Sequence, residues 1–197
     1  MRSPFGLTRG NSCSTATSES EPTLSKRASA RAGALFVVVF GPMTERWPPE
    51  WMAWRAGDGC PMCAEGRPNS NQLGTRFYEG RLSDAYLLRE DVSPGYSVVV
   101  WRGRHVAEPT ELHHEEAMRY WSEVLEVARL LEEHYRPIKT NYATNGNGVP
   151  HLHTQIVLRY PDDPAPRRPL PWPESTQPIS ASDYNSQVEA LRAASPR

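Results

Sequence analysis

Two histidines and a glutamine near the end of the sequence have the spacing of a chemical site. His151, His153 and Gln155 occupy every second position, and side chains two residues apart in a strand point to the same face. The intervening side chains would face the core, and these are Leu152, Thr154, Ile156 and Leu158. Because buried polar groups need hydrogen-bond partners, the polar face is either a solvated strand surface or a site with a chemical role.

The residues just before this strand favour a site that handles phosphate. Residues 145–148 (Asn-Gly-Asn-Gly) are predicted as a turn, and the backbone N–H groups of glycines can close on phosphate oxygens. Asn141 can hydrogen-bond either a phosphate or an imidazole ring. A neutral imidazole with a pKa near ~6.5 can attack phosphorus near pH 7 without a separate base. The sequence therefore predicts a nucleophilic histidine beside a phosphate site.

A pair of cysteines, Cys60 and Cys63, has the Cys-x-x-Cys spacing of two ligands to one tetrahedral zinc ion. A redox dithiol and two unligated cysteines are the alternatives. The third cysteine, Cys13, lies in a polar N-terminal stretch. Three cysteines cannot form a disulfide framework, so we expect reduced thiols and a cytoplasmic location.

The elements that must position these side chains are predicted to be short strands and one long helix. β-Branched and aromatic residues between turn signals predict strands over residues 77–79, 84–89, 96–101, 138–143 and 152–160. Strands paired through hairpins and covered by one long helix form an α+β domain with a mostly antiparallel sheet.

The long helix is predicted to begin at Pro109-Thr110 and to stop at Pro137. Apolar residues recur within it at steps of three and four. The predicted buried face consists of Met118, Trp121, Leu125, Ala128 and Leu131.

Four motifs, in order, resemble the histidine triad (HIT) superfamily. Residues 141–155 resemble its active-site stretch, in which Asn and a Gly-rich turn precede His-x-His-x-His or His-x-His-x-Gln. Residues 91–94 (Asp-Val-Ser-Pro) resemble the Asp-Ile-Ser-Pro turn of the nucleotide-binding hairpin, and residues 102–105 (Arg-Gly-Arg-His) resemble the end of the Pro-Lys-x-His strand. Residues 60–63 resemble the zinc-binding version. The succession of motifs is more specific than any one of them, and it implies a HIT-like fold over residues 58–160.

The resemblance implies that His153 is the nucleophile, which would form a nucleotidyl-histidine with the α-phosphorus of a nucleotide. Gln155 would hydrogen-bond the non-bridging oxygens, and Asn147 and the Gly148 N–H would share that charge. Asp91 matches the carboxylate that binds the ribose hydroxyls, with a turn-forming role as the alternative. The base pocket would be walled by Tyr86 and Leu88, although both can equally be core residues.

The resemblance also implies the remaining metal ligands. The zinc-bearing members of the family place a histidine at the Pro-Lys-x-His position and use the first histidine of His-x-His. Here these residues are His105 and His151. Together with Cys60 and Cys63 they would form a closed, structural zinc site, because four protein ligands leave no position for substrate.

Gln155 departs from the hydrolase pattern, which has histidine at that position. The His-x-His-x-Gln form is typical of the galactose-1-phosphate uridylyltransferase branch, whose chains are considerably longer. We therefore expect a nucleotidyl hydrolase or transferase acting on dinucleoside polyphosphates, nucleoside phosphoramidates or similar compounds. The alternatives are a dedicated uridylyl- or adenylyltransferase or phosphorylase, and a non-catalytic nucleotide-binding module. A homodimer is a family expectation.

Composition excludes two classes of partner. The 197 residues contain 22 Lys and Arg against 23 Asp and Glu, a formal charge of −1, so no strong field attracts the whole chain to nucleic acid or an anionic membrane. The longest apolar run, residues 34–40, is far shorter than the ~20 residues of a membrane span. We expect neither nucleic acid nor membrane as a partner.

The chain divides into one domain and two tails. Residues 1–42 are polar and predicted to be a disordered extension, and one hypothesis is that Met43 is the natural start. Residues 43–160 would form the HIT-like nucleotide-binding domain. Residues 161–197 hold eight of the 19 prolines and are predicted to be an extended arm. Ser182 could cap a short last helix with Tyr184, Val188 and Leu191 on one face.

Overall fold

The structure is a computed structural model that describes residues 47–89, 93–167 and 179–196. The extension predicted over residues 1–42 lies outside the described residues, as do Asp91 and residues 168–178 of the predicted arm. None of the described helices combines the length and the apolar character that crossing a membrane requires.

Five antiparallel strands form a single sheet in the order β1-β2-β3-β5-β4. In the chain they are β1 (Gly74–Glu79), β2 (Ser83–Leu88), β3 (Ser97–Trp101), β4 (Lys139–Ala143) and β5 (His153–Arg159). The predicted α+β class with its antiparallel sheet is confirmed. Strand β5, which carries the paired histidines, lies inside the sheet between β3 and β4, so its backbone is fixed from both sides.

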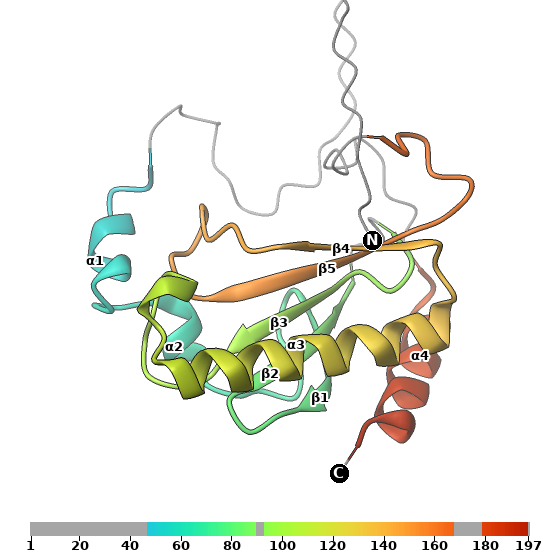
Figure 1. The fold of residues 1–197 in the computed structure, drawn as a ribbon, viewed down its shortest axis with the longest axis horizontal. Coiled ribbons are helices and arrows are strands. Elements are labelled where there is room, and N and C mark those ends of the chain that lie inside the picture. Colours follow the sequence, from blue (N-terminus) through green and yellow to red (C-terminus); the bar gives the residue numbers. More distant parts are fainter. Residues whose placement is uncertain (1–46, 90–92, 168–178, 197) are drawn as a thin grey trace, which may run out of the picture. The chain divides into compact units, whose positions relative to one another are not determined.

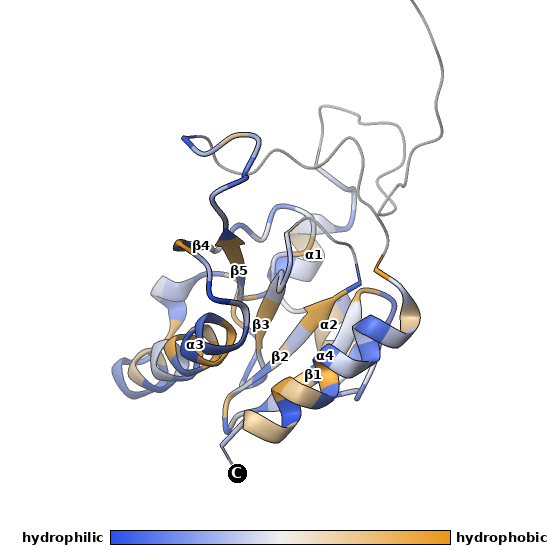
Figure 2. Ribbon diagram, turned by 90° about the vertical axis from the view of Figure 1, so that its right-hand side faces the viewer, coloured by the Kyte–Doolittle hydropathy of each residue, from blue (hydrophilic) through white to orange (hydrophobic). Residues whose placement is uncertain are grey.

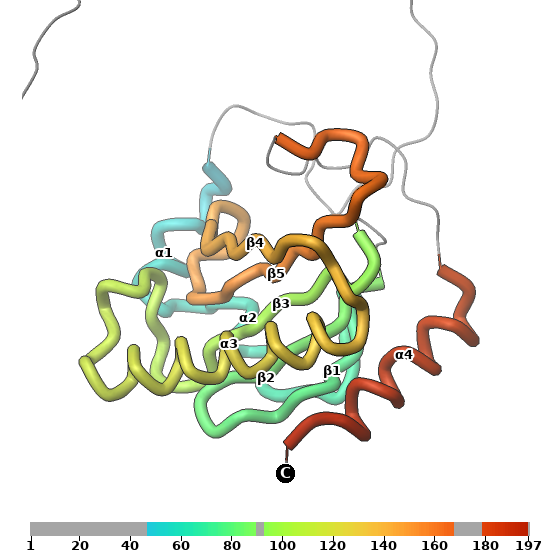
Figure 3. The backbone as a smooth tube through the Cα atoms, turned by 45° about the vertical axis from the view of Figure 1, so that its right-hand side comes forward, coloured from blue at the N-terminus to red at the C-terminus, as the bar shows by residue number. Residues whose placement is uncertain are grey.

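Two helices cover one face of this sheet. Helix α3 (His114–Tyr135) runs across the strands, and α4 (Ala181–Ala194) packs against β1 and α3, as Figures 1 and 3 show. Both helices are amphipathic, with hydrophobic and hydrophilic colours alternating around each in Figure 2. The core between the helices and the sheet includes Trp101, Tyr120, Leu131, Ile156 and Leu191.

The buried face of α3 differs from the predicted one. Ala128 and Leu131 are buried as expected, but Met118, Trp121 and Leu125 are 63%, 37% and 44% exposed. The side chains that the helix buries are Tyr120, Glu123, Val124, Val127, Ala128, Leu130 and Leu131. The α-helix also begins later than predicted, because Pro109–Glu111 form a separate 3-10 turn.

A buried carboxylate explains why the pattern misled. Glu123 is 3% exposed, and it accepts hydrogen bonds from the backbone N–H groups of Arg81 and Leu82 and from the Ser83 hydroxyl. It therefore caps the turn between β1 and β2 from the helix side. A charged residue on the core side removes an apolar position from the stripe that is really buried.

The last helix has the predicted face but a different cap. Tyr184, Val188 and Leu191 are the buried residues of α4. Its N-cap is Ser180, whose hydroxyl accepts from the N–H of Asp183, and Ser182 lies inside the first turn. The Tyr184 hydroxyl donates to the backbone carbonyl of Leu87 at 2.7 Å, which ties the helix to β2.

Two short helices precede the sheet in the chain: α1 (Trp51–Arg55) and α2 (Pro61–Glu65). The second face of the sheet carries a small apolar cluster of Tyr86, Val98 and Val100, against which Met62 of α2 packs. Helix α2 therefore lies over the face opposite to α3 and brings the two cysteines to the sheet.

Candidate functional site

The paired histidines of β5 emerge on the face opposite to α3, as the alternation predicts. Thr154 faces the helix, because its hydroxyl lies 2.8 Å from the Tyr120 hydroxyl of α3. The neighbouring residues His153 and Gln155 pair across the sheet with Val100 and Val98 of β3, which belong to the cluster on the second face. One face of β5 therefore packs into the apolar core, and the opposite face carries the polar side chains of His153 and Gln155.

The ring of His153 is held in one tautomer. Its Nδ1 lies 2.7 Å from the backbone carbonyl oxygen of His151. A carbonyl can only accept, so Nδ1 carries the proton and Nε2 keeps its lone pair. The residue is 9% exposed, and burial lowers its pKa below the ordinary value for histidine. A neutral imidazole with a free Nε2 has the form required of a nucleophile.

The loop between β4 and β5 supplies amides beside this ring. The Asn145 side-chain NH2 group donates to the Gln155 carbonyl oxygen at 3.3 Å, which leaves the NH2 group of Gln155 as the donor for an anion. Gly146 adopts a positive φ of 72°, a conformation that favours glycine. The carbonyl oxygen of Asn147 accepts from the indole N–H of Trp51 at 3.1 Å. The loop is therefore tied to β5 at one end and to α1 at the other.

Asn141 is the predicted catalytic residue that the structure does not bring to His153. It pairs with Val157 of β5, four residues beyond His153, which is roughly 13 Å along a strand. Its side-chain oxygen accepts from the Arg159 guanidinium at 3.1 Å. Asn145, which the sequence reasoning did not single out, takes the place beside Gln155. The Asn145-Gly146 dipeptide, a turn signal, was the feature of the sequence that could have pointed to Asn145.

The residues predicted to wall a base pocket have different environments. Tyr86 is 1% exposed and lies in the cluster beneath Met62, with its hydroxyl donating to the carbonyl of Pro68. It serves packing in this structure because the segment that carries α2 covers it. Leu88 is partly buried at the border of the same cluster. Asp91 lies outside the described residues.

Two cysteines and two histidines from distant parts of the chain form one compact cluster. The ligand atoms of Cys60, Cys63, His105 and His151 all lie within 4.8 Å of one another. Nδ1 of His151 is 3.5 Å from the Cys60 sulfur and 3.4 Å from the Cys63 sulfur. Nδ1 of His105 is 3.3 Å from the Cys63 sulfur. A tetrahedral ion with bonds of ~2.3 Å to sulfur and ~2.1 Å to nitrogen separates such atoms by about 3.5 Å.

Both imidazoles are oriented as metal ligands by their second nitrogen. Nε2 of His151 lies 2.8 Å from the carbonyl of Trp101, and Nε2 of His105 lies 3.3 Å from the carbonyl of Arg55. These carbonyls accept the Nε2–H protons, so the Nδ1 lone pairs are directed at the sulfurs. Metal-binding histidines characteristically donate their other N–H in this way.

Burial shifts the pKa of two members of the cluster, His151 and Cys63. Burial lowers the pKa of His151 to about 4, which keeps this ring neutral, as a ligand must be. Burial and the neighbouring Cys60 thiol raise the pKa of Cys63 to about 11. The Cys63 thiol thus resists ionisation unless a positive ion compensates its charge. The donor set, the spacing and the outer hydrogen bonds all fit a tetrahedral metal ion.

Comparison with known proteins identifies the domain. Residues 69–162 match the family model of the HIT domain. A histidine triad protein from Bradyrhizobium japonicum has 25% sequence identity and a TM-score of 0.56, over 61% of this chain and 89% of that protein. A histidine triad protein from Marinobacter aquaeolei has 27% identity and a TM-score of 0.55, over 61% of this chain and 87% of that one. No curated protein matches the sequence.

Proposed function

Because the chain belongs to the histidine triad superfamily through its HIT domain at residues 69–162, we propose that it cleaves or transfers a nucleoside monophosphate group through His153. The observation that carries this proposal is the hydrogen bond from Nδ1 of His153 to the carbonyl of His151. It leaves Nε2 as a neutral nucleophile in a nearly buried position.

The reaction would proceed in two displacements at the α-phosphorus. In the first, Nε2 of His153 forms a P–N bond as the P–O bond to the leaving group breaks, and the bonding electrons go to the leaving oxygen. In the second, water or another acceptor forms a P–O bond and gives up its proton, while the P–N bond breaks and its electrons return to Nε2. This is nucleophilic catalysis, which divides one difficult step into two easier ones.

Gln155 restricts the leaving group. An amide donates hydrogen bonds to phosphoryl oxygens, but it cannot deliver a proton as an imidazolium can. The leaving group should therefore be stable as an anion, which a phosphate is and an amine is not. Within the substrate classes expected from the sequence, this favours dinucleoside polyphosphates and other nucleoside diphosphate compounds over phosphoramidates.

The Cys/His cluster is proposed to hold a structural zinc ion. Two sulfur and two imidazole ligand atoms, all within 4.8 Å of one another, are a donor set typical of zinc. When bound, the ion supplies no open coordination position, and its contribution is stability. Cys60, Cys63 and the two histidines would then hold the segment around α2 against the sheet beside His153.

A nucleotidyltransferase or phosphorylase with a specific acceptor is the second candidate. Gln155 favours this candidate, because the transferase branch has glutamine at the same position of the motif. The Oε1 atom of Gln155 already accepts a hydrogen bond from Asn145. Gln155 is not a base, so it cannot activate a water molecule. A dedicated acceptor with its own acidic hydroxyl or phosphate would remove that requirement.

Two copies of the chain are proposed to associate through β4 and α3. Strand β4 is an edge strand, and edge strands offer unpaired backbone groups. Met118 and Leu125 stand at seven-residue steps from Glu132, which bonds to Thr140 of β4, so they lie on the β4 side of α3. The exposed large apolar side chains of this region are Met118, Trp121, Leu125, Ile138 and Tyr142.

The test of the function is incubation of the full chain with a panel of nucleotide esters, followed by intact mass. A mass increase equal to one nucleoside monophosphate supports the covalent route. Release of that group only on addition of an acceptor would select the transferase. Tight binding of nucleoside monophosphate without any adduct or turnover would select the non-catalytic binding module and overturn the enzyme.

A further inference from the structure

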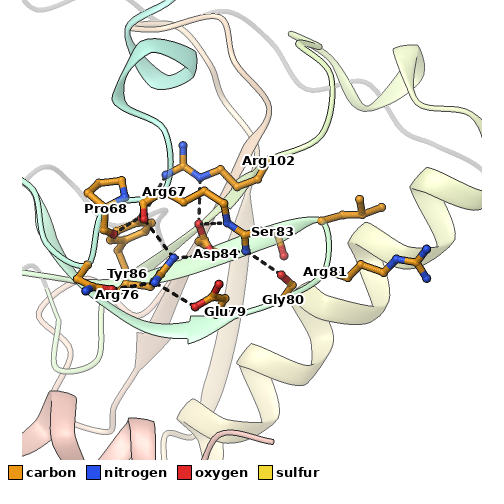
Figure 4. Close-up of polar contacts among 12 residues, drawn as sticks. Arg67, Pro68, Arg76, Glu79, Gly80, Arg81, Ser83, Asp84, Tyr86 and Arg102 are labelled. Atoms are coloured by element: carbon orange, nitrogen blue, oxygen red, sulfur yellow. Dashed lines mark hydrogen bonds and ion pairs between the residues drawn. The ribbon is translucent and has the colours of Figure 1, made fainter. Parts of the chain in front are cut away.

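A fully buried carboxylate stands on the same face of the sheet as the nucleophile. Asp84 of β2 is 0% exposed, and it pairs with Val100 of β3, which in turn pairs with His153 of β5. Three guanidinium groups converge on it, those of Arg67, Arg76 and Arg102 (Figure 4). Neither the family motifs nor the proposed chemistry uses this group.

The number of cations exceeds what the carboxylate requires. Arg67 alone binds both oxygens, with Nε at 2.9 Å and Nη2 at 2.6 Å, and such a bidentate pair already balances the charge of one aspartate. Arg102 and Arg76 lie further away, at 3.3 Å and 3.6 Å. Because burying a charged group is costly unless it is well paired, the two additional guanidinium groups call for a role beyond charge balance.

That role is indicated by what else these arginines contact. We define the covering segment as residues 60–72, which begins with the cysteine turn and includes α2. Arg76 donates to the carbonyl of Arg67 at 3.2 Å and to the side chain of Asn69 at 2.8 Å. The Tyr86 hydroxyl donates to the carbonyl of Pro68 at 3.0 Å. The network around Asp84 therefore binds the backbone of the covering segment at several points.

Helix α2 of the covering segment needs such contacts because it has little apolar anchoring. None of the residues of α2 is buried, and Met62 is the residue of α2 that packs against the cluster of Tyr86, Val98 and Val100. Apolar contact of this extent does not hold a short helix in one position. Polar contacts must determine where the cysteine turn lies on the sheet.

Arg102 connects the network to the metal cluster. Its side chain is 4% exposed, and its Nη1 donates to the carbonyl of Met62 at 3.0 Å while its Nη2 donates to the Tyr86 hydroxyl at 3.0 Å. Met62 stands between Cys60 and Cys63 in the sequence. Arg102 itself follows Trp101, whose carbonyl orients His151, and precedes His105 by three residues.

We propose that Asp84 and Arg102 are positioning residues for the metal cluster: Asp84 holds the Arg102 guanidinium, and Arg102 fixes the cysteine turn beside the end of β3 and the start of β5, which His105 follows and His151 precedes. The inference rests on the proposed zinc site, and it states that two residues that are not ligands contribute to the affinity for the metal. A planar guanidinium contacts three partners at once, which a lysine ammonium on a flexible stem does not. Outer partners of metal ligands typically change affinity by 10- to 100-fold.

The experiment measures Zn²⁺ affinity of the full chain by competition with a chromophoric chelator. Arg102→Met and Asp84→Asn are each expected to weaken Zn²⁺ binding about 10- to 100-fold, and Arg102→Lys by less. Tyr86→Phe removes only the hydroxyl between Arg102 and Pro68 and should cause a loss of a few-fold. Glu123→Gln is the matched control, because it also alters a buried carboxylate. Glu123 lies on the α3 side of the sheet, where it holds the turn between β1 and β2.

Three results would overturn the inference. One is wild-type affinity in the folded Arg102 and Asp84 variants, which would leave the zinc site standing. Another is an equal loss in Glu123→Gln, since affinity would then follow general stability. The third is a wild-type chain that binds no Zn²⁺, which also removes the metal assignment but leaves the His153 adduct unaffected. If Arg102→Met and Asp84→Asn fail to fold, the comparison of Tyr86→Phe with Glu123→Gln decides.

Discussion

The imidazole of His153 donates its Nδ1 proton to the backbone carbonyl of His151, two residues earlier in the chain and 2.7 Å away. His151 in turn donates from Nε2 to the carbonyl of Trp101 and directs Nδ1 at the two cysteines. The proposed nucleophile and a proposed metal ligand are therefore joined through one backbone carbonyl. Whatever fixes the ring of His151 also limits how far the carbonyl that orients His153 can move.

Replacement of His153 should remove the covalent chemistry. His153→Ala deletes the only atom proposed to bond to phosphorus, so we expect no nucleotidyl adduct by intact mass. Turnover should fall by on the order of 10³- to 10⁶-fold, as when other catalytic nucleophiles are removed. Circular dichroism should still report the native fold. His134→Ala, at the exposed end of α3, is the control and should keep full activity; an adduct on His153→Ala would refute the assignment.

Replacement of Gln155 should slow adduct formation without abolishing it. Gln155→Ala removes a hydrogen-bond donor to the phosphoryl oxygens, and loss of one such donor typically costs about 10²- to 10³-fold in rate. Gln155→Glu should be slower still, because a carboxylate repels the phosphate. Rapid-quench measurement of the first turnover tests both. Equal rates for wild type and Gln155→Ala would show that the amide does not act on the transition state.

Removal of the metal should lower stability. Cys60→Ser loses a buried sulfur ligand, so zinc content measured by atomic spectroscopy should fall. At free zinc 100-fold above Kd, binding contributes about 2.7 kcal/mol, which corresponds to a loss of about 5–10 °C in Tm for a chain of this size. Cys13→Ser is the control, because Cys13 is not one of the proposed ligands. Unchanged zinc content in Cys60→Ser would contradict the ligand set.

The proposed association of two copies should depend on Trp121. Trp121→Glu places a charge among the exposed apolar side chains on the β4 side of α3, and sedimentation should then report a monomer where the wild type is a dimer. Met52→Glu alters an apolar residue of α1 that is more exposed than Trp121, at 70% against 37%, and should leave the dimer intact. A monomeric wild-type chain at micromolar concentration would end this proposal.

Much of the fold could be read from local pattern, and the exceptions share a cause. Val98, Val99 and Val100 are β-branched residues, which are enriched in strands, and the polar–apolar alternation after His151 predicts which side chains of β5 face the core. The face of α3 was wrong because two neighbouring stripes both satisfy helical spacing. The choice between Trp121 and Tyr120 depends on the sheet, where Thr154 meets the Tyr120 hydroxyl.

The site divides in the same way. The Cys-x-x-Cys and His-x-His motifs are local and supply Cys60, Cys63 and His151, whereas His105 was predicted from the resemblance of residues 102–105 to the Pro-Lys-x-His strand end of the family. Asn141 was misplaced because its position relative to His153 depends on the register of β4 against β5, which the sequence spacing alone does not specify. Asp84 carries no motif, and its importance is visible only when Arg67 and Arg102 are seen to converge on it (Figure 4).

Sequence by itself determined the kinds of groups available: two thiols, a pair of imidazoles on one strand face, and amides beside glycines in a loop. These follow from residue type and from the periodicity of side-chain direction, which is two residues in a strand and three to four residues in a helix. Both depend only on residues close together along the chain. Tertiary structure decided the tautomer of His153, the buried stripe of α3 and the anchoring of the cysteine turn. Each of these depends on a partner far away in sequence, and such contacts form only when the strands and helices pack.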